Sequence, residues 1–107
     1  MSSNVVDDLF KSEFIPPDGL FTLQILIKEG KLYRNTELFS EMDPFLVLRH
    51  NKKKYRTGVI EKGGRHPVWN ETLTIPNVRL TDEINIECFD EDLIMDDCVG
   101  QAKLTVQ

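Results

Sequence analysis

The chain has 107 residues, of which 40% are hydrophobic and 29% are charged, and these values fit one globular domain. Its net charge of −5 argues against generic nucleic-acid binding, because that binding needs a basic surface to displace counterions. No stretch approaches the roughly 20 apolar residues of a membrane-spanning helix, and the N-terminus has no secretory signal pattern. With two cysteines, no disulfide framework is indicated, and we expect a cytosolic chain with free thiols.

Residues 1–18 differ in pattern from the rest and are expected to form a tail before a domain spanning 19–107. Apolar residues of the tail fall near helical spacing, and Pro16-Pro17 forbids continuation of a helix. The tail is therefore predicted to be either a short docked helix or an extra edge strand, and the sequence leaves both open.

From Leu20 onward, apolar and polar residues alternate in short runs, which is typical of half-buried strands. We expect strands at 20–27, 44–48, 52–59, 68–75, 84–88 and 99–106, with Pro76 ending the fourth. The expected core includes Leu23, Ile25, Val47, Trp69, Leu73, Ile86 and Leu104. Six short strands with turn signals between them and no long helix predict an all-β, antiparallel β-sandwich.

An acidic stretch lies between the last two predicted strands, and five of the eight residues from Asp90 to Asp97 are acidic. Crowded carboxylates repel one another unless a cation, a basic partner or solvent relieves the repulsion. The three residues between them, Leu93 to Met95, are apolar. The stretch is either a solvated hairpin whose apolar tip folds under, or a binding loop.

Three motifs, in this order, resemble those of C2 domains, the eight-stranded calcium- and phospholipid-binding sandwiches. They are Met42-Asp43-Pro44-Phe45, Pro67-Val68-Trp69-Asn70-Glu71, and Asp90-x-Asp92 followed by Asp96-Asp97-x-Val99-Gly100. The resemblance covers about residues 20–106 and implies that sandwich fold, although the family's final strand has no counterpart before Gln107. Either the chain is clipped, or residues 1–15 or a partner covers that edge.

The resemblance also implies calcium as a cofactor, since calcium takes six to eight hard oxygen ligands. The implied ligands are Glu37, Asp43, Asp90, Asp92, Asp96 and Asp97. Glu37 stands where calcium-binding members usually carry Asp, and Ser40 replaces a Gly. The third loop is one residue short, so the last ligand is either Asp96 or Asp97. Asp43 also has a simpler interpretation, because Asp before Pro often serves a turn.

Two apolar tips are expected on the same rim as these carboxylates, and we predict that they insert into a membrane. Their residues are Leu38, Phe39, Leu93, Ile94 and Met95. The alternative is that they pack onto the sandwich or on a strand outside this sequence.

Lys52, Lys54 and Arg56 are expected on one face of the third strand. They match positions where family members carry basic residues for phosphoinositide headgroups. Basic residues on an exposed strand also serve solubility and edge protection, which is the alternative interpretation.

We therefore expect a calcium-dependent module that binds anionic phospholipid membranes, cytoplasmic and peripheral, with a role in signalling or membrane trafficking. The alternative is a calcium-independent protein-interaction module, or a structural subunit of a larger assembly, with a protein partner along the open sheet edge. An enzyme is not expected, because the sequence shows no nucleophile–His motif, no Gly-rich phosphate loop and no metal-binding His pair.

Overall fold

The computed structural model describes residues 16–33 and 41–106, which form six strands and no helix. The strands are β1 (Phe21–Glu29), β2 (Pro44–His50), β3 (Lys53–Arg56), β4 (Val68–Val78), β5 (Glu83–Asp90) and β6 (Asp97–Thr105). Every strand pairing is antiparallel, so the predicted all-β fold is confirmed. The predicted helix or strand of the tail falls on residues 1–15, outside the described residues.

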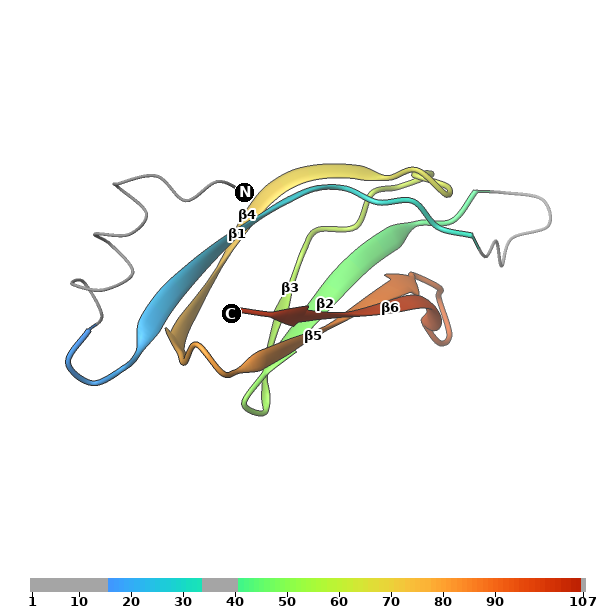
Figure 1. The fold of residues 1–107 in the computed structure, drawn as a ribbon. Coiled ribbons are helices and arrows are strands. Elements are labelled where there is room, and N and C mark those ends of the chain that lie inside the picture. Colours follow the sequence, from blue (N-terminus) through green and yellow to red (C-terminus); the bar gives the residue numbers. More distant parts are fainter. Residues whose placement is uncertain (1–15, 34–40, 107) are drawn as a thin grey trace.

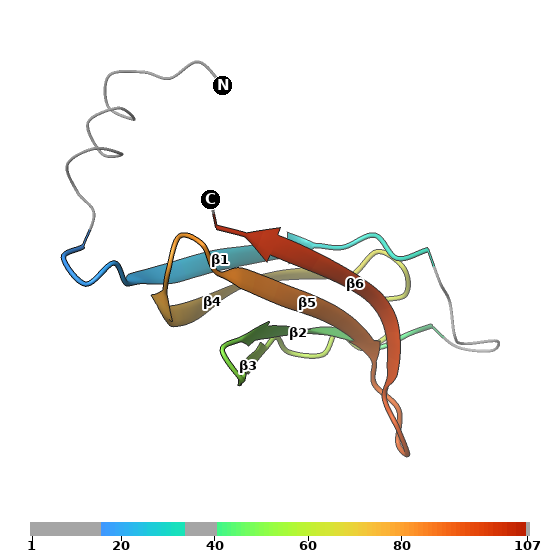
Figure 2. The same ribbon diagram turned by 60° about the horizontal axis from the view of Figure 1, so that its bottom comes forward.

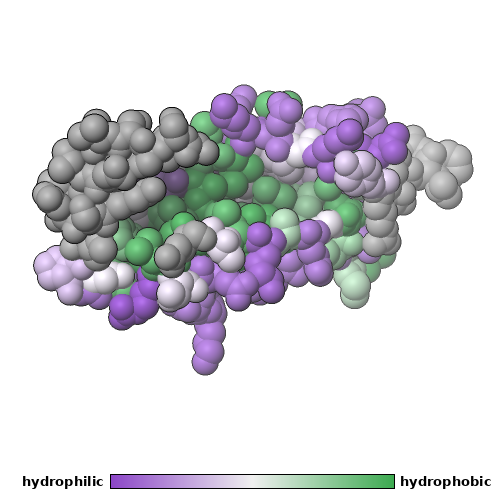
Figure 3. Space-filling view, viewed as in Figure 1, coloured by the Kyte–Doolittle hydropathy of each residue, from purple (hydrophilic) through white to green (hydrophobic). Residues whose placement is uncertain are grey.

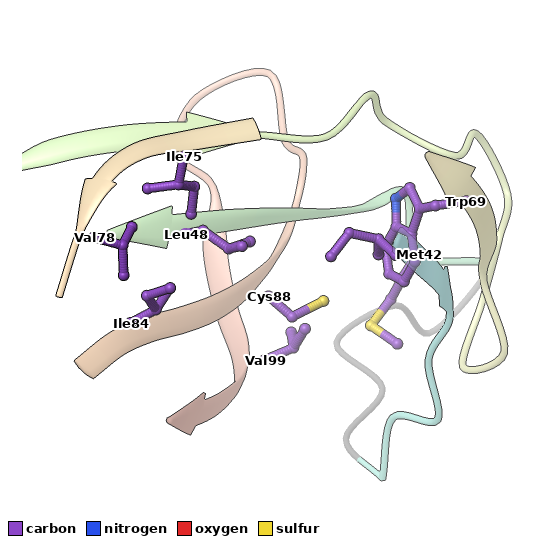
Figure 4. Packing of buried hydrophobic residues seen from close by; sticks show 9 residues of the cluster. Met42, Leu48, Trp69, Ile75, Val78, Ile84, Cys88 and Val99 are labelled. Carbon is purple, nitrogen blue, oxygen red and sulfur yellow. The ribbon is translucent and has the colours of Figure 1, made fainter. Parts of the chain in front are cut away.

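The strands form two layers (Figure 1). One layer pairs β1 with β4, and the other has the order β3-β2-β5-β6. The core lies between the layers, where Leu48, Ile75 and Ile84 are completely buried (Figure 4). Trp69 belongs to this cluster, as expected, and its indole Nε1 donates a 3.1 Å hydrogen bond to the carbonyl of Gly58.

The predicted core is only partly correct. Leu23, Ile25, Leu73 and Ile86 are partly buried against the central cluster. Val47 is buried, but it lines a groove with Phe45 on the opposite side of the four-stranded sheet. Leu104 is wrong as a core residue, because it is exposed at 36%. In the described part of the chain, two strands face four, so the distal half of β6 is left uncovered.

Pro76 does not end β4, which continues to Val78. The register passes from Leu23↔Ile75 to Phe21↔Val78, so three steps along β4 face two along β1. This irregularity is a β-bulge, where a proline is tolerated because a ladder hydrogen bond is already interrupted.

The β2–β3 connection is a tight hairpin. Asn51 and Lys52 both have positive φ, 47° and 67°, which is the conformation of a two-residue type I′ turn. Lys52 therefore lies in the turn, and β3 begins at Lys53.

The strand register decides where the acidic stretch lies. Asp90 pairs with Pro44 on one side and with Asp97 on the other. The residue before β2 and the β5–β6 loop therefore share one end of the sandwich, from which the loop projects (Figure 2). The β2–β3 hairpin closes the other end of β2.

Candidate functional site

Asp43 and Asp90 lie side by side at the base of the loop end. The backbone N–H of Asp43 donates a 2.9 Å hydrogen bond to Oδ1 of Asp90, and the backbone N–H of Glu91 donates to the carbonyl of Asp43. Oδ1 of Asp43 accepts a 2.7 Å hydrogen bond from the backbone N–H of Lys62. Because Asp90 is almost completely buried, its position is set by the fold.

The other acidic residues occupy the projecting loop. Asp92, Asp96 and Asp97 are exposed, and Oδ1 of Asp96 accepts a 2.9 Å hydrogen bond from the backbone N–H of Asp92. This bond closes the loop across the apolar residues between them. Within residues 16–33 and 41–106, no three acidic, cysteine or histidine side chains form a group able to hold a metal ion.

The donor chemistry of these residues fits calcium, which prefers carboxylate and carbonyl oxygens. The described geometry meets that requirement only in part, because it brings together Asp43 and Asp90 and leaves the loop carboxylates apart. Glu37, the remaining predicted ligand, lies outside the described residues.

The tip of the loop, residues 93–95, is apolar and points into solvent. Leu93 and Ile94 are essentially fully exposed, and Met95 is largely exposed. Large apolar side chains exposed together indicate a surface that meets an apolar partner. Leu38 and Phe39, the other predicted apolar tip, lie outside the described residues.

A cationic groove lies beside this loop on the outer face of the four-stranded sheet. The groove has a volume of about 340 Å³. Its lining residues are Phe45, Val47, Arg49, Lys54, Arg56, Phe89 and Asp96. Phe45 and Phe89 stack with ring centroids 5.5 Å apart, and the Arg56 guanidinium lies 4.1 Å above the centre of the Phe45 ring.

The registers explain why these cations converge. Arg49 pairs with Lys54, and Val47 pairs with Arg56, so the side chains of all four project from one face of the sheet. Of the three basic residues predicted as a site, Lys54 and Arg56 line this groove, whereas Lys52 lies in the hairpin turn and does not.

A family model described as the C2 domain matches residues 21–107. The chain belongs to the C2 domain family. "Elicitor-responsive protein 3" of Oryza sativa subsp. japonica is 31% identical over 87 residues, which are 80% of this chain and 60% of that protein. This C2 domain therefore spans about 60% of the length of that relative.

Solved structures show the same fold. A "C2 domain-containing protein from putative elicitor-responsive gene" is 28% identical, with a TM-score of 0.65 over 81% of this chain and 65% of that one. A calcium-bound structure of two C2 domains of Extended-Synaptotagmin 2 gives a TM-score of 0.67, with 24% identity over 87% of this chain and 36% of that one. C2 domains are modules for membrane lipids or for proteins, and this chain shares that general role.

Sequence reasoning missed Arg49 and the aromatic floor of the groove. The period of two along β2 places Phe45, Val47 and Arg49 on one side, so the signal was present. Arg49 also forms an ion pair with Glu87 of β5. Pairing of β3 and β5 with β2 is needed to bring these residues together, and the sequence does not give that register.

The two thiols of this C2 domain lie near the base of the loop. Burial raises the pKa of Cys88 to about 11, with smaller contributions from Cys98 and Asp90. A thiol with such a pKa stays protonated near neutral pH and is a poor nucleophile. Cys88 therefore acts in packing, as a member of the core cluster.

Proposed function

We propose that this C2 domain docks on anionic phospholipid membranes through the 93–95 tip, in a calcium-dependent manner. The observation that carries the proposal is the exposure of Leu93 and Ile94 at the end of a projecting loop. Each apolar side chain of this size contributes ~1.5–3 kcal/mol when it is fully transferred from water. Several side chains inserted together support reversible binding to a membrane.

We expect this docking to require a cation because carboxylates surround the tip. Asp43, Asp90, Asp92 and Asp97, together with Glu37, are the residues that would hold calcium. Of the two candidates for the last ligand, Asp97 is preferred because it pairs with Asp90, whereas Asp96 lines the groove. A bound calcium ion would cancel negative charge that otherwise repels an anionic leaflet. The carboxylates of Asp43 and Asp90 accept hydrogen bonds from the backbone N–H groups of Lys62 and Asp43, respectively.

The cationic groove adds a second contact with the same membrane. Lys54 and Arg56 lie on β3 next to the loop, and each such charge near an anionic leaflet contributes about 1 kcal/mol. We propose phosphorylated inositol headgroups as ligands here, on the aromatic floor of Phe45 and Phe89. The module would thus work at the cytoplasmic leaflet, as a non-catalytic peripheral component of signalling or membrane trafficking. In the described residues, no helix is both long and apolar enough to cross a bilayer.

Vesicle sedimentation tests the proposal. The 107-residue chain should bind phosphatidylcholine vesicles that contain phosphatidylserine in calcium, and should be released by chelator. Changing Leu93→Ser and Ile94→Ser should weaken this binding, whereas Leu26→Ser, at an exposed position on β1, should not. Equal binding by the tip double variant and the Leu26→Ser variant would overturn the proposal.

A second candidate function, protein binding, is favoured by the open side of the sandwich. A cavity of about 400 Å³ lies between the layers and is lined by residues such as Leu32, Trp69, Ile86 and Val99. Figure 3 shows this apolar hollow in green between the two sheets. In the described part of the chain, β1 pairs only with β4, so its other edge can accept a partner strand.

Amide hydrogen exchange of the monomer tests this second function. Alternate amides of β1 should exchange rapidly if its outer edge is free for a partner strand. Protection of every β1 amide in the monomer would show that the edge is already covered, and would contradict this function.

A further inference from the structure

We propose that Asp96 is a competing negative charge built into the cationic groove, and that it lowers the groove's affinity for phosphorylated anions. This inference rests on the proposed headgroup site and deepens it, because it names the residue that sets the strength of that site. Asp96 comes from the β5–β6 loop, whereas the cations of the groove come from β2 and β3.

Of the three cations that line the groove, one forms an ion pair within the described part of the chain and two do not. Arg49 forms an ion pair with Glu87, and Arg56 lies over the Phe45 ring and donates to the carbonyl of Thr57. Neither Lys54 nor Arg56 forms an ion pair with a carboxylate among the described residues. Two cations in the groove are therefore available to an anionic ligand.

Asp96 lines the same groove and is the carboxylate among its lining residues. Its Oδ1 accepts the backbone N–H of Asp92, which holds the side chain in place at the loop end of the groove. It lies beyond ion-pair distance of the groove cations, so no direct ion pair with them neutralises its charge. Its negative charge therefore acts on the groove through space.

A carboxylate in this place repels every anion that enters the groove. Its influence falls off over about 10 Å at 0.1 M salt, so it reaches a ligand in the groove and is weakened by added salt. Removal of one such charge should strengthen the binding of a polyvalent phosphate about threefold to tenfold. The loop that carries the apolar tip thereby also lowers the affinity of the groove for anions. The two proposed membrane contacts are therefore linked through this loop.

The test compares Asp96→Asn with Glu91→Gln, which removes an acidic charge from the same loop outside the groove. The amide oxygen introduced by Asp96→Asn would still accept the Asp92 N–H, so the loop should keep its shape. Calorimetric titration in chelator, with inositol 1,4,5-trisphosphate as the soluble probe, should show threefold to tenfold tighter binding for Asp96→Asn. Glu91→Gln should strengthen binding less, because Glu91 does not line the groove. The difference should shrink at high salt.

A parallel arm replaces the soluble probe with vesicles that contain phosphatidylinositol 4,5-bisphosphate, which separates a lipid-bound headgroup from a free one. Equal strengthening by both variants, or none by Asp96→Asn, would overturn the role of Asp96. Absence of inositol phosphate binding by all three chains would overturn the groove as an anion site. Binding to phosphatidylserine vesicles through the tip would then still be measured independently, so the two failures are distinguishable.

Discussion

The backbone N–H of Asp43 donates a 2.9 Å hydrogen bond to the carboxylate of Asp90, and so joins the residue before β2 to the last residue of β5. Asp90 is 2% exposed, and its neighbour on the other side is Asp97, the first residue of β6. A carboxylate proposed as a cation ligand is thus also part of the hydrogen-bonding that holds the loop end together.

Substitution of Asp90 should therefore affect stability even without calcium. Asp90→Ala leaves the partly buried N–H of Asp43 without this acceptor, which should lower the free energy of unfolding by about 1–3 kcal/mol. Asp90→Asn keeps an acceptor oxygen and should cost less. Asp92→Ala, at an exposed position, should change stability by no more than about 0.5 kcal/mol. Urea denaturation in chelator measures all three, and equal losses for Asp90→Ala and Asp92→Ala would contradict this account.

Trp69 should be a major stabilising residue of the core. Trp69→Ala should cost about 3–5 kcal/mol, because a large buried ring is replaced by a cavity. Trp69→Phe retains an aromatic ring but removes the bond to the Gly58 carbonyl, and it should cost less than the alanine variant. Thermal unfolding in parallel with urea titration measures both. A loss below about 1 kcal/mol for Trp69→Ala would contradict the burial described here.

Acid should destabilise the end of the sandwich where β2 meets the β4–β5 connection. The backbone N–H of Arg79 and the side chain of His50 hold the pKa of Asp82 below its usual value of 3.8. This carboxylate therefore contributes stability above the unfolded-state pKa, and the contribution is lost as the pH falls through the lower folded-state pKa. Asp82→Asn should flatten the fall in stability below about pH 4. Urea unfolding at a series of pH values measures this stability. If Asp82→Asn and the unaltered chain lose stability equally in acid, this role of Asp82 is contradicted.

Two of the differences between the strand predictions and the structure, at Leu104 and Pro76, have clear physical causes. Alternation of apolar residues predicted the strands, because the pleat alone determines which face a residue occupies. Leu104 fits that alternation but remains exposed, since burial depends on a covering layer that local sequence does not specify. Pro76 was expected to end β4, and only the pairing with β1 reveals the bulge that accommodates it.

The candidate site also has a part that the sequence predicts and a part that it does not. Asp43, Asp90 and Asp97 were placed at one end by motif resemblance, and strand register shows the backbone contacts that join them. The lining of the groove depends on how β2 pairs with its neighbouring strands, and the sequence does not specify that register. For this reason Arg49 was overlooked and Lys52 was included. The cation-binding geometry depends on side-chain positions in loops, which no local pattern determines.

The groove predicts unequal effects of two neighbouring lysines. Lys54→Ala should weaken binding to vesicles with phosphatidylinositol 4,5-bisphosphate by roughly fivefold, since one charge near an anionic surface contributes about 1 kcal/mol. Lys52→Ala should weaken it less, because Lys52 lies in the turn outside the groove. Vesicle sedimentation at fixed salt gives the comparison. Equal effects would mean that general charge, and not the groove, attracts the lipid.

Insertion of the tip is the central claim, and fluorescence of an Ile94→Trp variant measures it most directly. Position 94 is almost fully exposed, whereas the native Trp69 is buried in the core. With calcium and phosphatidylserine vesicles, the emission of the new tryptophan should shift to the blue and be quenched by brominated acyl chains. Chelator should reverse both changes. Emission that neither shifts nor is quenched when calcium and these vesicles are present would contradict docking through the 93–95 tip.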